Sequence, residues 1–81
     1  MSRANDIKKI DIHGMLAAEA KRRIDREIAA APQQIKRIVI IHGCNNGTAL
    51  RDMVRTKIKS PRIEGIVPTF SNDGETTIYL K

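Results

Sequence analysis

The sequence predicts a two-layer α/β sandwich, of the α+β type, with two helices and a mixed four-stranded sheet in the order β-α-β-α-β-β. Two strand-like apolar segments are each followed by a segment with the period of a helix. An Asp-Gly pair, typical of a hairpin turn, separates the last two strand-like segments. Strand–helix–strand units pair in parallel through right-handed crossovers, so only the closing hairpin adds an antiparallel strand.

A change of hydrophobic period predicts the first strand and the first helix. In residues 7–13, isoleucine alternates with Asp11 and His13, as in a strand with one buried face. From residue 16 to about residue 30, apolar side chains recur every four residues, on one face of a helix. Pro32 ends this helix, because proline cannot continue the helical hydrogen bonding.

The second strand is predicted at residues 35–42, where an unbroken apolar run is typical of a buried central strand. Thr48 follows in a position to cap the second helix. This helix has an apolar stripe at helical spacing and stops at Ser60, because the residue before Pro61 avoids the helical region.

The last two strands are predicted at residues 63–70 and 76–80. Gly65 and Pro68 indicate an edge strand or a bulge, because neither residue fits the interior of a sheet. The turn at residues 71–74 joins the two strands into a hairpin.

Length and composition limit the partners. The chain of 81 residues fits one domain at residues 7–81, after a tail at residues 1–6 that we expect to be disordered. No apolar run could span a membrane, and the single cysteine suits the reducing cytoplasm. The net charge of +6 favours nucleic acid as the partner. Only Phe70 and Tyr79 are aromatic, so contacts mainly through phosphates are expected.

The two predicted parallel strands end in the same tripeptide, Ile-His-Gly, at residues 12–14 and 41–43. Carboxyl ends of adjacent parallel strands share one edge of the sheet, about 4.8 Å apart. His13 and His42 are therefore expected to stand side by side. Asp11 precedes His13 by two residues and so shares its face of the sheet.

The same edge is expected to hold a phosphate. The amino ends of both helices open toward it, with unpaired N–H groups and partial positive charge. Gly14, Gly43 and Gly47 would let the backbone approach the anion closely, and Arg51 adds positive charge. One histidine as general base and the other as general acid, with Asp11 fixing the tautomer, would supply the proton transfers of phosphodiester cleavage.

At these residues the sequence resembles the small MutS-related (Smr) domain family. Residues 10–14 match the family's hydrophobic-Asp-x-His-Gly motif. Residues 42–51 match in part its second motif, His-Gly-x-Gly-x-Gly followed by Leu-Arg, with a loop that is one residue longer and poorer in glycine. The resemblance extends over nearly the whole chain.

The resemblance implies a fold like the C-terminal domain of a translation initiation factor, and nucleic-acid binding, often with endonuclease activity on DNA or RNA. It implies catalysis by Asp11 and His13, and substrate binding or catalysis by His42, Gly43 and the following loop. With the residue reasoning above, the expected catalytic residues are Asp11, His13 and His42. The residues expected to bind nucleic acid are Gly14, Gly43, Asn45, Asn46, Gly47, Thr48, Arg51 and Arg55.

Other functions stay open at this stage. A non-catalytic nucleic-acid- or ribosome-binding module would use the same loop, although it would not need the Asp11–His13 pair. A hydrolase of small phosphorylated metabolites is less well supported, because no nucleobase or sugar pocket is evident. Both faces of the second strand are apolar, so its helix-free face is either covered by its own side chains or meets a partner, such as a second copy in a weak homodimer.

No cofactor is required by these residues. A divalent cation, Mg²⁺ or Mn²⁺, stays open as an aid to cleavage. Asp11, His13, His42 and Cys44 have the chemistry of zinc ligands, but the family pattern does not call for cysteine in this loop. We therefore predict no metal site.

Overall fold

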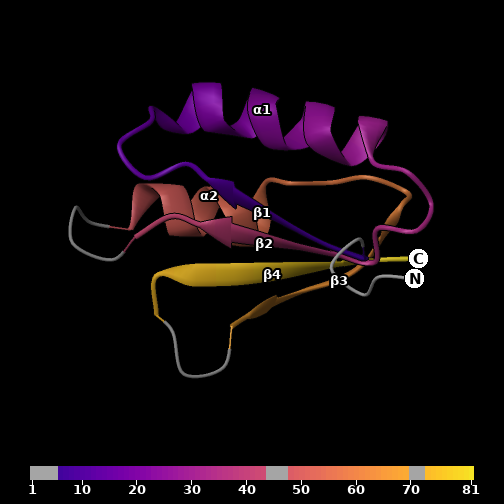
Figure 1. Ribbon diagram of the computed structural model, residues 1–81. Helices are drawn as coiled ribbons and strands as arrows, with labels where there is room; N and C mark the ends of the chain where they lie inside the picture. The colour runs from indigo at the N-terminus through magenta and orange to yellow at the C-terminus, as the bar shows by residue number, and fades with distance from the viewer. Residues whose placement is uncertain (1–5, 44–47, 70–72) are drawn as a thin grey trace.

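The fold is that of the predicted sandwich, with six elements in the predicted order (Figure 1). The structure is a computed structural model that describes residues 6–43, 48–69 and 73–81. Its elements are β1 (Ile7–Asp11), α1 (Ala17–Ala30), β2 (Arg37–Ile41), α2 (Ala49–Thr56), β3 (Ile63–Pro68) and β4 (Glu75–Leu80). Fold class, element order and the mixed sheet are thereby confirmed.

The sheet has the strand order β1-β2-β4-β3. β1 and β2 are parallel, and β4 is antiparallel to both of its neighbours, β2 and β3. β3 lies at the edge and carries a register shift between Ile63 and Gly65, so both features predicted from its glycine and proline are present. The carboxyl ends of β1 and β2 point to one end of the molecule (Figure 1).

Both helices pack on one face of the sheet and form a single core with it (Figure 1). The sheet contributes fully buried isoleucines at alternate positions of β1, β2 and β4, because successive side chains of a strand point to opposite faces. Each buried isoleucine contributes about 1.5–3 kcal/mol. The fully buried isoleucines of sheet and helices are Ile10, Ile12, Ile24, Ile28, Ile38, Ile40 and Ile78.

The helix starts differ in detail from expectation. Leu16, predicted on the buried stripe, is the cap residue of α1, and 70% of it is exposed. Thr48 does occupy the cap position of α2, but its side chain caps no backbone N–H group. Its hydroxyl instead donates to the carboxylate of Asp52 (3.0 Å).

Asp6 is the first residue that the structure describes. Its carbonyl accepts a hydrogen bond from the backbone N–H of Lys36 (2.8 Å). Residues 1–5 of the expected tail, and residues 70–72 of the expected third strand and turn, lie outside the described residues. Within the described part of the chain, neither helix has the length and apolar character needed to cross a membrane.

Arg62 offers a test of the packing of α1. Its guanidinium donates to the carbonyls of Ile28 (2.6 Å) and Ala31 (2.7 Å) at the carboxyl end of α1, where the last turn has no basic residue of its own. Arg62→Met should lower the free energy of unfolding by about 1–3 kcal/mol, measured by urea denaturation. Lys59→Met, at an exposed position, should change it by less than about 0.5 kcal/mol. Equal effects of the two substitutions would contradict this account.

Candidate active site at the carboxyl ends of β1 and β2

A tight turn after β1 carries His13 out to the surface. The backbone N–H of Ile12 still pairs with the carbonyl of Ile41 (2.9 Å), and Met15 N–H then closes a turn onto the Ile12 carbonyl (3.0 Å). Gly14, the third residue of this turn, has φ +82°, the value that a type II turn requires there and that glycine adopts without strain. The glycine of the first Ile-His-Gly motif is thus explained by the turn.

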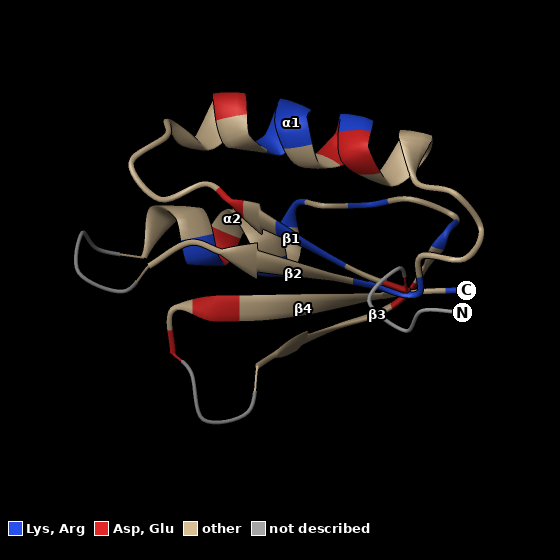
Figure 2. Ribbon diagram, in the orientation of Figure 1, with Lys and Arg blue, Asp and Glu red and all other residues tan. Residues whose placement is uncertain are grey.

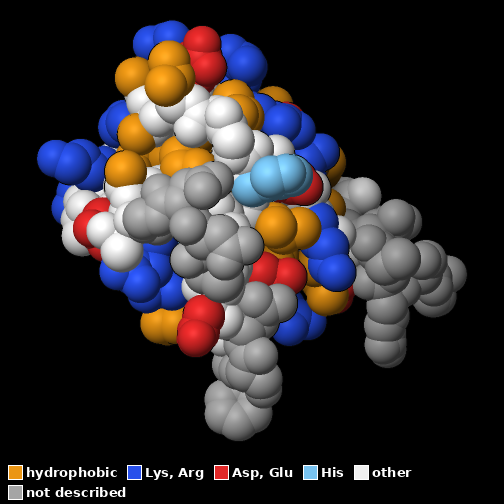
Figure 3. Space-filling model, turned by 90° about the vertical axis from the view of Figure 1, so that its left-hand side faces the viewer, with side chains coloured by type: hydrophobic (Ala, Val, Ile, Leu, Met, Phe, Trp, Pro, Cys, Tyr) orange, Lys and Arg blue, Asp and Glu red, His pale blue; other side chains and the backbone are white. Residues whose placement is uncertain are grey.

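Asp11 and His13 form an exposed pair. Oδ1 of Asp11 lies 2.5 Å from Nδ1 of His13 and accepts the backbone N–H of the same residue (3.1 Å). The side chains of His13 and Asp11 are 69% and 51% exposed, and Figure 3 shows a histidine with an acidic side chain against it at this end of the molecule. The sequence reasoning about Asp11 and His13 therefore agrees with their observed placement.

The hydrogen bonds of this pair favour an ionised Asp11 carboxylate and place a proton on Nδ1 of His13. The bond from the His13 ring, followed by the bond from the His13 backbone, lowers the pKa of Asp11, and the positive charge of Arg23 acts in the same direction. Because an ionised carboxylate only accepts, Nδ1 of His13 carries the proton. In the neutral ring Nε2 keeps a lone pair, and among the described residues it has no hydrogen-bond partner. His13 can accept a proton at that atom.

His42 does not stand beside His13, and that expectation is wrong by one residue. The β1–β2 register pairs Asp11 with Ile41, which brings His13 opposite Gly43. A Cβ built on Gly43 would lie 3.6 Å from Cβ of His13. Because strand side chains alternate between faces, the offset turns His42 into the core, where it is 5% exposed.

Both ring nitrogens of His42 have partners. Nδ1 lies 2.9 Å from the carbonyl of Gly43 and must donate, because a carbonyl only accepts. Nε2 lies 2.9 Å from the hydroxyl of Thr76, which also accepts the Nε–H of Arg55 (3.0 Å). With neutral His42, the Thr76 hydroxyl donates to Nε2. A chain of hydrogen bonds thus runs from Arg55 through Thr76 and His42 to Gly43.

The carbonyl of Gly74 holds the end of β2 from the other side. It accepts the backbone N–H groups of His42 (2.9 Å) and Gly43 (3.0 Å). Gly43 adopts φ +78°, a conformation that favours glycine. The β3–β4 hairpin and the His42 ring together fix Gly43 against His13. Sequence reasoning missed Gly74 and Thr76, because neither is near His42 in the sequence.

The two arginines predicted at the site, Arg51 and Arg55, contact different partners. Arg51 lies 3.5 Å from the carboxylate of Asp52, and Arg55 is held by Thr76. Arg23 was not predicted as a site residue, yet its guanidinium reaches the carbonyl of Asp11 (3.4 Å). Of the predicted loop, Thr48 is exposed at the start of α2. Asn45, Asn46 and Gly47 lie outside the described residues, as does Cys44.

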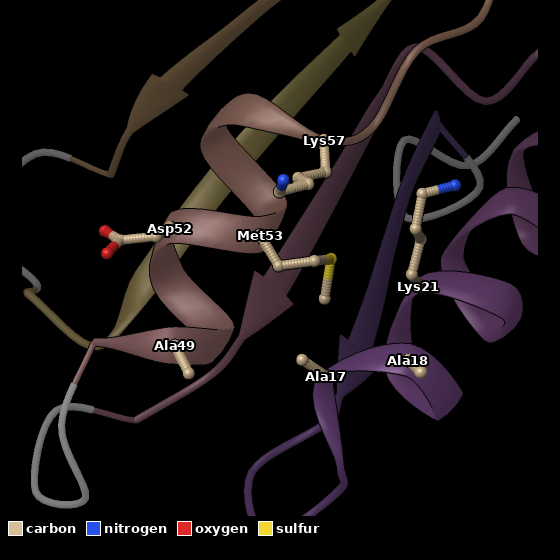
Figure 4. Close-up of a pocket in the computed structure, with 7 residues that line it drawn as sticks. All are labelled: Ala17, Ala18, Lys21, Ala49, Asp52, Met53 and Lys57. Atoms are coloured by element: carbon tan, nitrogen blue, oxygen red, sulfur yellow. The ribbon is translucent and has the colours of Figure 1, made fainter.

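A groove between the two helices has neither Asp11 nor His13 in its lining. The groove has a volume of about 260 Å³ and lies between α1 and α2, with none of the predicted site residues in its lining (Figure 4). The residues that line it are Ala17, Ala18, Lys21, Ala49, Asp52, Met53 and Lys57. Among the described residues, no three His, Cys, Asp or Glu side chains gather as metal ligands would.

Comparisons with known proteins agree with the fold described above. The family model of the Smr domain matches residues 10–81. Among solved structures, the Smr domain of Thermus thermophilus MutS2 superimposes with a TM-score of 0.80 and covers 91% of this chain and 98% of that chain. At 24% sequence identity this likeness shows the fold alone. No curated protein sequence matches the chain.

The lowered pKa of Asp11 can be tested by NMR titration of its side-chain carboxyl carbon. In His13→Ala the hydrogen bond from the ring is lost, so the pKa of Asp11 should rise toward its ordinary value. The carboxyl carbon of Asp25, whose partner is Lys21, serves as the internal reference, and its chemical shift at pH 7 should be the same in both proteins. An unchanged Asp11 titration would show that the His13 ring does not hold the carboxylate.

Thr76 tests the hydrogen-bond chain behind Gly43. Thr76→Val keeps the shape of the side chain but leaves His42 and Arg55 without their shared partner, and should cost about 1–3 kcal/mol of unfolding free energy. Thr76→Ser keeps the hydroxyl and should retain the hydrogen bonds. The measurement is urea denaturation followed by circular dichroism. A valine variant as stable as wild type would rule out a structural role for the hydroxyl.

Proposed function

Because this chain belongs to the Smr domain family, we propose that it binds nucleic acid and acts as an endonuclease on DNA or RNA. The family is a nucleic-acid-binding one that is often associated with nucleases. The observation that supports cleavage is the exposed Asp11–His13 pair, in which Nε2 of His13 is open to a substrate. The net charge of +6 favours a polyanionic substrate.

In the proposed mechanism, one imidazole both accepts and returns the proton. Nε2 of His13 accepts a proton from the attacking oxygen, either water or the ribose 2′-hydroxyl, as that oxygen bonds to phosphorus. The Asp11 carboxylate stabilises the imidazolium that forms. His13 then donates the proton to the leaving oxygen as its bond to phosphorus breaks. Attack by the 2′-hydroxyl yields a 2′,3′-cyclic phosphate, and attack by water yields a phosphate monoester.

His42 has a different part in this proposal, as a positioning residue. Its Nδ1–H holds the carbonyl of Gly43, which packs beside His13. Gly14 and Gly43 keep the backbone close to the substrate phosphate. Arg23, whose guanidinium lies beside the Asp11 carbonyl, would offset charge on the phosphoryl oxygens.

We also propose substrate contacts for the remaining predicted residues. Arg51 and Thr48 lie at the start of α2, where free N–H groups and the helix dipole favour a phosphate. The adjoining loop residues Asn45, Asn46 and Gly47 complete the proposed binding segment. Arg55 acts from behind it, through Thr76. The expected setting is the cytoplasm, where structured or ribosome-associated RNA is abundant.

One observation favours a non-catalytic nucleic-acid-binding module instead. Burial of His42 leaves one free histidine, whereas an acid and a base acting together would need two. A binder of this kind would show salt-dependent affinity and would release no product. The Asp11–His13 pair would then serve only to shape the surface.

Cleavage of end-labelled RNA and DNA, single-stranded and hairpin, separates the two functions. His13→Ala should lower the cleavage rate by about 100-fold or more while most binding is retained. Asp11→Asn should also lower it, because an amide cannot stabilise the imidazolium. Arg26→Ala, an exposed change on α1, is the control and should cut like wild type.

Product analysis completes the test. Reactions with EDTA and with added Mg²⁺ or Mn²⁺, followed by identification of the new ends, define the nucleophile. Equal cutting by wild type and His13→Ala would assign the activity to a contaminating nuclease. Binding without any product from the wild-type protein would favour the non-catalytic module.

A further inference from the structure

The sheet has a second face that no helix covers, and we call its outward side chains the open face (Figure 1). Strand alternation assigns Asp11 and Lys9 of β1 to it, with Arg37 of β2 and Tyr79 of β4. Lys9 and Arg37 are exposed, and Tyr79 is 39% exposed. The same alternation assigns Glu75 of β4 to the open face, in the row of Asp11. The open face therefore has cations and an aromatic ring toward one end and the carboxylates of Asp11 and Glu75 at the other.

Tyr79 has open space on one side and a cation on the other. Its cross-strand partners are Arg37 on β2 and Gly65 on β3. Gly65 has no side chain, and a Cβ built there would meet no atom within 4 Å. Because directly opposed side chains in antiparallel strands point to the same face, the gap lies beside Tyr79. A flat ring next to an open space and a guanidinium suits a stacked nucleobase with its phosphate.

The cations of the open face are unpaired, in contrast to several others of the chain. Lys9 and Arg37 form no ion pair with any described residue. On α1, by contrast, basic and acidic residues lie close together along the helix, with ion pairs at Lys21–Asp25 (2.8 Å) and Arg23–Glu27 (4.0 Å) (Figure 2). The positive charges that are available to bind a polyanion therefore include those of Lys9 and Arg37 on the open face.

The open face leads to the Asp11–His13 pair. Lys9 precedes Asp11 by two residues and lies on the same face, between Asp11 and the row of Arg37 and Tyr79. Strand spacing and rise per residue place Tyr79 roughly 16 Å from Asp11 along the sheet. A short single strand can cover this path with its phosphates near both cations, whereas paired bases of a duplex are not free to stack on a protein ring.

We propose that the open face binds a single-stranded segment of the nucleic-acid substrate, with one base stacked on Tyr79 and phosphates at Arg37 and Lys9. This proposal rests on the nucleic-acid binding proposed above and adds single-strand selectivity to it. The groove between α1 and α2 is a weaker candidate, because small apolar side chains form much of its lining and neither Asp11 nor His13 lines it.

Binding is measured by fluorescence anisotropy with a short labelled single strand and with its duplex, in the full chain carrying His13→Ala to prevent cleavage. Tyr79→Ala should weaken single-strand binding about 5- to 100-fold and affect duplex binding less. Tyr79→Phe, which keeps the ring, should bind like the parent protein, which is the full chain carrying His13→Ala alone. Arg37→Ala should weaken binding and reduce its salt dependence, whereas Arg26→Ala on α1 is the matched control.

Gly65→Val tests the open space directly. Its backbone is outside the left-handed region, so valine is tolerated, but its side chain would fill the gap beside Tyr79. We expect weaker single-strand binding with an otherwise unchanged amide NMR spectrum. In titrations of the parent protein, the single strand should shift amides of Gly65, Arg37 and Tyr79.

Several outcomes overturn the proposal. Equal binding by the parent and Tyr79→Ala, or shifts confined to the groove between the helices, would exclude the open face while leaving nucleic-acid binding intact. Concentration-dependent shifts of open-face amides without oligonucleotide would assign the face to a second copy of the chain. No binding of strand or duplex by the parent or the wild-type protein would refute the proposed function, and this inference with it.

Discussion

The parallel register between β1 and β2 is the constraint on which the site depends. Pairing of Asp11 with Ile41 puts His13 beside Gly43 and sends His42 to the opposite face. A shift by one residue would exchange these roles and would also turn the isoleucines of one strand out of the core. Burial of those isoleucines, each worth about 1.5–3 kcal/mol, therefore fixes the position of the Asp11–His13 pair as well as the fold.

The position of β4 connects the core to this end of the sheet. β4 lies between β2 and β3, so Thr76 reaches His42 and Gly74 reaches the last backbone groups of β2. A buried polar ring is costly unless its nitrogens are hydrogen-bonded, and both nitrogens of His42 are. The core thus supports Gly43 from behind with directional bonds, which apolar packing alone would not provide.

The fold could be predicted from the sequence because hydrophobic period, the helix-ending prolines and the Asp-Gly turn are local signals that all agree. The edge position of β3 could also be predicted from Gly65 and Pro68. The Asp11–His13 pair was predictable, since the two residues are close in the sequence and share a face.

The partners of His42 were not predictable in this way. Two identical tripeptides suggest equivalent positions, but the register offsets them by one residue. Register is set by the packing of whole strands, and no residue near His42 encodes it. Thr76 and Arg55 join His42 only because β4 enters the sheet next to β2, a long-range pairing that the hairpin signal alone did not specify.

The two histidines therefore have different surroundings: His13 is exposed beside Asp11, whereas His42 is buried with both ring nitrogens hydrogen-bonded. This difference limits the chemistry that the domain can perform. With one free imidazole, proton removal and proton return in the proposed mechanism pass through the same nitrogen, which requires Asp11 to stay ionised throughout. Its lowered pKa comes from hydrogen bonds rather than from burial, since the carboxylate lies in water. Water also weakens the attraction between Asp11 and an imidazolium. In the proposed mechanism the pair would gain strength when a substrate covers it, and the surfaces that bring nucleic acid to Asp11 would then be as important to catalysis as the pair itself.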